Sequence, residues 1–149
     1  MKAFCTQLAE SGFLAFAPDL YHGKVTDKIA DAETLSGALF ANPNQAKADL
    51  ADATTFLNER AGQDERGLAV IGFSLGASFA LDLSVTAPEH IQSAVVFYGT
   101  RPGDYSSSKA AYLGHFAEND PFEPQSEVPE ACWTSGDFLS LQWHWTLVQ

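Results

Sequence analysis

Hydrophobic positions along the chain follow two different spacings. Short continuous apolar runs lie at residues 13–17, 68–71, 94–98 and 110–116. Between these runs, apolar residues recur every three or four positions at 2–11, 26–40, 45–61 and from 77 to about 86. Continuous runs are typical of strands buried on both faces, and the longer spacing is typical of amphipathic helices. Their alternation predicts an α/β fold, with a mostly parallel sheet flanked by helices and joined by right-handed crossovers.

The expected helices have recognisable stops in the sequence. Gly12 ends the first helix, whose apolar face carries Phe4, Cys5 and Leu8. The segment Asn42-Pro43-Asn44 separates the second helix from the third. We expect the third helix to close at Gly62 and to face inward with these residues: Ala48, Leu50, Ala53, Phe56 and Leu57.

Length and charge restrict the class of protein. The chain has 149 residues, 46% of them hydrophobic, which fits a single globular domain. The formal net charge of −11 and the absence of a basic run argue against nucleic-acid binding. No apolar run reaches the ~20 residues of a membrane span, and the first residues do not resemble a signal peptide. We therefore expect a cytoplasmic protein without a membrane partner, in which Cys5 and Cys132 are reduced thiols.

The stretch from Gly67 to Leu83 carries the chemistry that the rest of the chain supports. It reads as a strand, a tight turn Gly72-Phe73-Ser74-Leu75-Gly76, and then a helix. This is the context of a Gly-x-Ser-x-Gly nucleophile elbow, in which a strained turn projects the serine hydroxyl. We expect a Cβ at either glycine to collide with its surroundings, and Leu75 N–H to donate to an oxyanion. In the alternative, Ser74 only caps the following helix.

A serine nucleophile needs a histidine base and a carboxylate that orients it. Asp120 follows the apolar run 110–116 and precedes Pro121, which suits the acid of an α/β-hydrolase triad. Its alternative role is to cap a following helix. Glu118 and Asp104 are weaker candidates for the same acid.

Four segments together resemble the dienelactone hydrolase family of α/β-hydrolases. They are Ala15-Phe16-Ala17-Pro18-Asp19-Leu20-Tyr21, Gly72-Phe73-Ser74-Leu75-Gly76-Ala77, Val96-Phe97-Tyr98-Gly99 and Gly114-His115-Phe116-Ala117-Glu118-Asn119-Asp120-Pro121-Phe122. The resemblance implies hydrolysis of a small carboxylic ester or lactone, with Ser74 as nucleophile, Asp120 as acid and no metal or organic cofactor. The namesake enzymes carry cysteine at the position of Ser74, and they hold the substrate carboxylate with arginines. Residues 20–40 contain no arginine, which argues against dienelactone itself.

The resemblance also implies that parts of the family fold are missing. The family has strands before the first helix expected here, and a loop after one of them supplies the second oxyanion donor. Residues 1–130 are therefore expected to form an incomplete hydrolase core. Its open sheet edges could pair with a second copy of the chain. The alternative function is a non-catalytic fragment or pseudo-enzyme that lacks the triad histidine.

The histidine of the family motif has no clear counterpart in the chain. His22 and His90 are expected at the surface, His115 lies inside an expected strand, and His144 lies in Trp143-His144-Trp145. Residues 131–149 form an atypical tail that holds all three tryptophans. Read one base later, the codons of the tail can spell Gly-Thr-Gly-His-Trp-Phe, which is similar to the family's histidine motif. We therefore predict a frame change near Glu130, and coding DNA whose shifted codons do not give Gly-Thr-Gly-His would contradict it.

Overall fold

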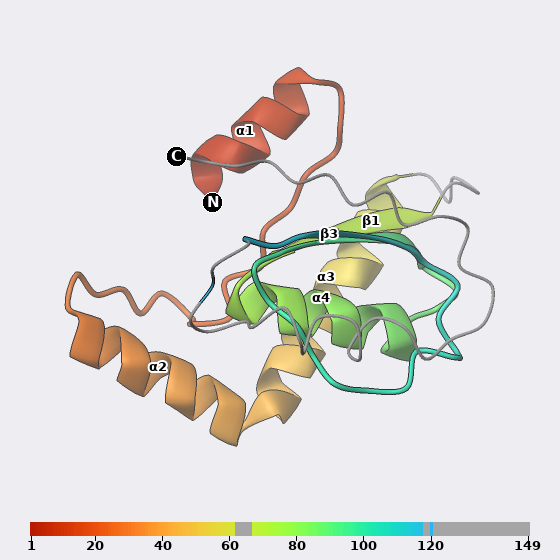
Figure 1. The fold of residues 1–149 in the computed structure, drawn as a ribbon. Helices are drawn as coiled ribbons and strands as arrows, with labels where there is room; N and C mark the ends of the chain where they lie inside the picture. The colour runs from red at the N-terminus through yellow and green to blue at the C-terminus, as the bar shows by residue number, and fades with distance from the viewer. Residues whose placement is uncertain (62–66, 118–119, 121–149) are drawn as a thin grey trace. The chain divides into compact units, whose positions relative to one another are not determined.

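The computed structural model describes residues 1–61, 67–117 and 120 of the chain. The chain falls into two compact units, Met1–Asp64 and Glu65–Gln149, which are described separately. Figure 1 labels helices and strands of the chain. Residues 131–149, the expected atypical tail, lie outside the described residues. Within the described part, no helix is both long enough and apolar enough to cross a membrane.

The first unit contains the three helices that the sequence predicts. They are α1 (Lys2–Glu10), α2 (Ile29–Ala41) and α3 (Pro43–Arg60). The chain leaves α1 through Gly12 in a left-handed conformation, with φ of +90°, where glycine is the least strained residue. The proline of the predicted break is the first residue of α3, where its fixed φ and missing N–H are tolerated. The prediction of a stop at Asn42 is therefore confirmed.

Two expectations for the first unit are wrong. Residues 13–17 form no strand, and Phe13, Leu14 and Phe16 are all exposed. A strand requires a hydrogen-bonded neighbour, and no described strand pairs with this segment. Ala48 is exposed, although Ala53 on the same helix is buried as expected. A small side chain such as alanine is a weak signal for the direction of a helix face, because its burial gains little free energy.

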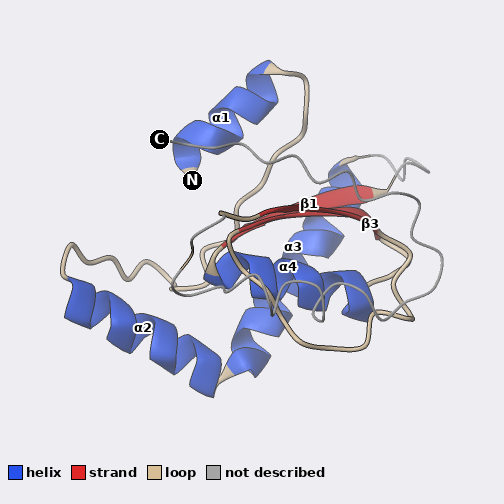
Figure 2. Cartoon of the chain, viewed as in Figure 1, coloured by secondary structure: helices blue, strands red, loops and turns tan. Residues whose placement is uncertain are grey.

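The second unit is a three-stranded parallel sheet with a helix against it (Figure 2). The strands are β1 (Leu68–Phe73), β2 (Ile91–Phe97) and β3 (Ala111–His115), in the order β1-β2-β3, and α4 (Leu75–Thr86) connects the first two. All three strands match apolar runs of the sequence. The predicted α/β class is confirmed for the part of the chain that the structure describes.

The core of the second unit lies between α4 and the facing side of the sheet. Ala77, Ala80 and Leu81 of α4 pack with Val96 of β2 and with Tyr105 from the loop that follows β2. The small side chains of α4 let the helix approach the sheet closely. Next to this cluster, the Tyr112 hydroxyl lies 2.7 Å from Ser84 Oγ and donates to Ser108 Oγ at 2.6 Å. Ser84 is fully buried, so this hydrogen-bonded network keeps a polar group satisfied inside the unit.

Candidate active site

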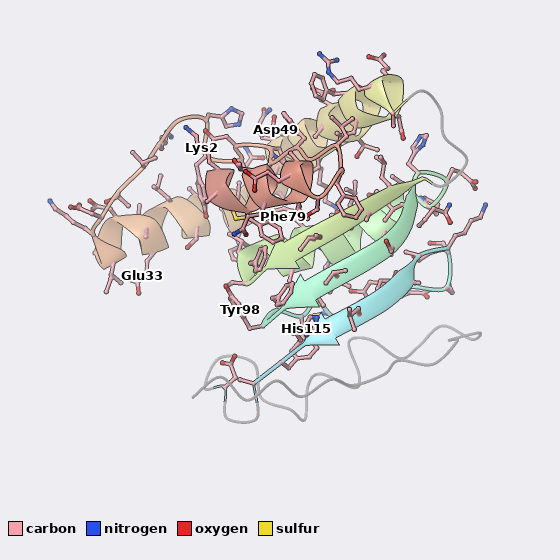
Figure 3. The ribbon with its side chains drawn as sticks, turned by 90° about the horizontal axis from the view of Figure 1, so that it is seen from above. Lys2, Glu33, Asp49, Phe79, Tyr98 and His115 are labelled. Atoms are coloured by element: carbon pink, nitrogen blue, oxygen red, sulfur yellow. The ribbon has the colours of Figure 1, made fainter. Side chains whose placement is uncertain are left out.

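The three strands of the second unit end side by side on aromatic rings. Phe73, Phe97 and His115 are register partners across β1, β2 and β3. The rings of Phe73 and Phe97 stack with centroids 4.8 Å apart, and those of Phe97 and His115 stack at 4.5 Å. Figure 3 shows His115 and the neighbouring Tyr98 at this same end of the sheet. Ligands of open α/β sheets bind at the carboxyl ends of the strands, so this is the edge where a site is expected.

Ser74 lies at this edge, between β1 and α4, in an unusual backbone conformation. Its φ is +50° and its ψ is −122°, a region that residues with a Cβ rarely adopt. Its N–H donates to Phe97 O at 2.9 Å, which fixes the turn to the end of β2. The Ser74 side chain makes no capping hydrogen bond to α4, and the residue is exposed. Ser74 therefore occupies the N-cap position of α4, but without the side-chain hydrogen bond that a capping serine would make.

The glycines around this turn match the expectation only in part. A Cβ on Gly72 would lie 2.4 Å from Gly76 O and 2.6 Å from the Cα of Ala77, so the expected collision is confirmed there. A Cβ on Gly76 would have no described atom within 4 Å, so the expectation for Gly76 is wrong. Gly76 lies in the first turn of α4, where a side chain can point away from the packed strand. A Cβ on Gly99 would lie 2.4 Å from Ser74 O, a requirement that the sequence interpretation missed.

The candidate oxyanion donor and the candidate acid lie next to strand ends. Leu75 is the first residue of α4, and the first N–H groups of a helix have no partner inside the helix. Asp120 follows the end of β3 and is half-buried. Asp104 is engaged locally, because Ser106 N–H donates to its carboxylate at 2.9 Å and holds its pKa below the ordinary value. Glu118 lies outside the described residues.

Three of the four histidines, His22, His90 and His115, are described. His22 Nε2 lies 2.9 Å from Asp49 Oδ2 on α3, so this exposed residue has a partner that the sequence did not indicate. His90 is exposed just before β2, as expected. His115 stacks on Phe97. Among the described residues, no hydrogen bond joins Ser74 to an imidazole, and His144 lies outside them.

The segment that follows β2 packs against the serine turn, and the sequence analysis did not predict this contact. Tyr98 has φ of +40°, its N–H donates to His115 O at 2.8 Å, and its ring lies 6.4 Å from that of Phe73. Gly99 touches the Ser74 carbonyl. Arg101 pairs with Asp82 of α4 at 2.8 Å. The only signal in the sequence was the glycine at the end of an expected strand, which can mark a close approach of two backbones.

The comparisons with known proteins agree with this architecture, in which α4 connects the parallel strands β1 and β2 and a serine turn lies at the carboxyl edge of the sheet. The model of the dienelactone hydrolase family matches residues 1–144. The chain therefore belongs to the dienelactone hydrolase family, which has the α/β-hydrolase fold. The match includes most of residues 131–149, so the predicted frame change still needs the coding DNA to test it.

Several curated proteins are similar to the chain over most of its length. "Protein usf" of Aquifex pyrophilus is 31% identical over 132 residues, which cover 86% of this chain and 57% of that protein. A protein of Aquifex aeolicus (strain VF5) named "Putative carboxymethylenebutenolidase" is 27% identical over 143 residues, or 91% of this chain and 62% of that protein. A protein of the same name from Escherichia coli (strain K12) is 31% identical over 144 residues, covering 86% and 52%. The chain thus spans between half and two thirds of the length of these relatives. No solved structure gives a significant match to the chain.

Proposed function

We propose that this member of the family hydrolyses a small carboxylic ester or lactone, with Ser74 as the nucleophile. The observation that carries the proposal is the backbone of Ser74, which has φ of +50° at an exposed turn between β1 and α4. Strain of this kind costs roughly 1–3 kcal/mol and is concentrated at functional sites. The name carboxymethylenebutenolidase, which relatives carry, supports an unsaturated lactone as the type of substrate.

The proposed reaction proceeds through an acyl-enzyme. Ser74 Oγ attacks the carbonyl carbon of the ester while a histidine base accepts the hydroxyl proton. Leu75 N–H, at the start of α4, donates to the negative oxygen that forms, and the helix dipole adds to this stabilisation. The bond to the leaving oxygen then breaks, that oxygen takes the proton from the histidine, and water releases the acyl group by the same steps. Asp120 orients the histidine. This scheme uses no metal and no organic cofactor.

A second function is favoured by the positions of the histidines. Within the described part of the second unit, neither His90 nor His115 is hydrogen-bonded to Ser74, so these residues do not complete a catalytic triad. A chain without a base would be a non-catalytic member of the family that keeps the turn only as architecture. Loss of one triad member leaves only the residual effect of the oxyanion donors and of substrate binding, about 10³–10⁴-fold over water.

The two functions differ in the reactivity of Ser74 Oγ towards a fluorophosphonate probe. The purified full chain is treated with the probe, and the modified residue is identified by mass spectrometry of peptides. We expect covalent labelling at Ser74 in the wild-type chain and its loss in Ser74→Ala, with circular dichroism showing that both are folded. A folded, monodisperse wild-type chain that takes up no probe would contradict the hydrolase and favour the non-catalytic function.

A further inference from the structure

A buried carboxylate on α4 has no part in the proposed reaction. Asp82 lies in the middle of α4, eight residues after Ser74, and is 9% exposed. A carboxylate in such a position is stable only with a charged or hydrogen-bonding partner. Arg101 supplies one, since its Nη2 lies 2.8 Å from Asp82 Oδ1.

Arg101 is held at its backbone as well as at its side chain. Its carbonyl oxygen accepts a hydrogen bond from the Tyr105 hydroxyl, at 2.5 Å. Tyr105 is 3% exposed and belongs to the cluster that packs α4 on the sheet. The guanidinium is therefore joined to α4 directly, and the carbonyl is joined to the same core through a buried ring. These two contacts fix the position of Arg101 in the loop that follows β2.

The residues just before Arg101 are those that contact the serine turn. Phe97 O accepts the N–H of Ser74 at 2.9 Å. Gly99 lies so close to the Ser74 carbonyl that a Cβ there would be 2.4 Å from the oxygen. A continuous series of contacts thus leads from Ser74 along α4 to Asp82, from Asp82 to Arg101, and from Arg101 back through Gly99 to Ser74. Movement of the segment 97–101 would be transmitted to the serine.

We propose that the Asp82–Arg101 ion pair positions Ser74, by holding the segment 97–101 against the serine turn. This inference rests on the proposed function, because it concerns the reactivity of the same serine. Asp82 and Arg101 are positioning residues and touch no substrate. When the pair is absent, Gly99 is no longer held in place, and Ser74 Oγ samples orientations that are poorly aligned for attack.

The first test compares second-order rates of fluorophosphonate labelling at Ser74. Displacement of a reacting group by about 1 Å can cost up to ~100-fold in rate, so we expect Arg101→Met to label roughly 10–100-fold more slowly. Arg101→Lys keeps the positive charge and should recover most of the rate. Lys109→Met is the matched control, because Lys109 belongs to the same loop and forms an exposed ion pair with Glu89, which lies before β2 and away from Ser74. The control should label at the wild-type rate.

The second test does not depend on reactivity, and so separates this inference from the proposed function. Hydrogen exchange of the Ser74 amide, which is bonded to Phe97 O, is followed by NMR in the full chain. We expect at least tenfold faster exchange in Arg101→Met, with Val95 and Val96 amides of β2 unchanged. Asp82→Asn, which is close to isosteric, provides a second variant if Arg101→Met does not fold.

The two tests together distinguish failure of the proposed hydrolase from failure of the positioning role. If the wild-type chain is not labelled but the Ser74 amide is selectively exposed in the variants, the hydrolase is wrong and the positioning role stands. If Arg101→Met changes neither the labelling rate nor the Ser74 amide, the positioning role is wrong. It is also wrong if Arg101→Met accelerates exchange equally at Ser74 and in β2, since the pair would then support only the stability of the whole unit.

Discussion

Replacing Gly99 by alanine is the most direct test of how the serine turn is packed. A Cβ at this position would lie 2.4 Å from Ser74 O and 2.8 Å from the Cβ of Ala77. Ordinary contacts of a Cβ begin at 3.4 Å. The turn or the end of β2 must therefore move apart by roughly 1 Å to admit the methyl group. Ser74 O belongs to the backbone at the start of α4, so no flexible side chain can absorb this movement.

The expected cost of Gly99→Ala follows from the rigidity of these contacts. Overpacking of a closely packed site destabilises a protein by about 1–3 kcal/mol. With a urea dependence of about 2 kcal/mol per molar, the midpoint of unfolding should fall by roughly 0.5–1.5 M. Unfolding is followed by far-ultraviolet circular dichroism, which reports on the helix and strand content of the chain.

Gly76→Ala is the matched control for this experiment. It adds the same methyl group two residues after Ser74, where no described atom lies within 4 Å. Gly76 belongs to the first turn of α4, so alanine should leave stability unchanged or raise it by up to ~1 kcal/mol. Gly99→Ala with a wild-type midpoint, or Gly76→Ala with the larger loss, would refute the packing described for the turn.

Three further predictions concern strain, buried polarity and a surface ion pair. Ser74→Gly and Ser74→Ala both remove the hydroxyl, but glycine adopts the positive φ of residue 74 without strain. The glycine variant should therefore be about 1 kcal/mol more stable than the alanine variant in urea unfolding. Equal stabilities would mean that the turn is unstrained. Tyr112→Phe removes the hydroxyl that is hydrogen-bonded to Ser84 and Ser108, and should lower the free energy of unfolding by about 1–2 kcal/mol. The same change at the exposed Tyr98 should lower it by under ~0.5 kcal/mol. Similar losses in the two variants would contradict the hydrogen-bonded network. The hydrogen bond and charge of Lys109 lower the pKa of Glu89, so Lys109→Met should raise the Glu89 pKa towards 4.5 in an NMR titration. In the wild-type chain, the stability that the ion pair contributes is present at neutral pH and is lost as the pH falls through the lowered pKa. An unchanged Glu89 pKa in the variant would show that the pair does not form in solution.

The sequence was most informative where apolar spacing and chain breakers agreed. The runs at 68–71, 94–98 and 110–116 became β1, β2 and β3, and the break at Asn42-Pro43-Asn44 lies between α2 and α3. In each case a local pattern and a local stop specify the same boundary. The position of Ser74 on a strained turn was predictable for the same reason, because the strand, the turn and the helix are contiguous.

Contacts between distant residues could not be predicted in this way. Residues 13–17 have the composition of a strand, but composition does not show whether a neighbouring strand is available to accept their hydrogen bonds. Gly99 is required by Ser74, which precedes it by 25 residues, and the Asp82–Arg101 pair spans 19 residues. Such requirements arise from tertiary packing, which leaves no periodic signal in the sequence.

The conformation of Ser74 bears on the choice between an enzyme and a non-catalytic relative. A connection that only had to turn the chain from β1 into α4 would be least strained with glycine at residue 74, because φ is +50° there. Serine at this position adds a Cβ to a strained backbone, and its hydroxyl makes no capping hydrogen bond with α4 that would offset the cost. The hydroxyl therefore contributes nothing visible to the architecture of the turn, while it lies exposed at the carboxyl edge of the sheet. The strain at Ser74 therefore supports the proposed chemical role over a purely structural one.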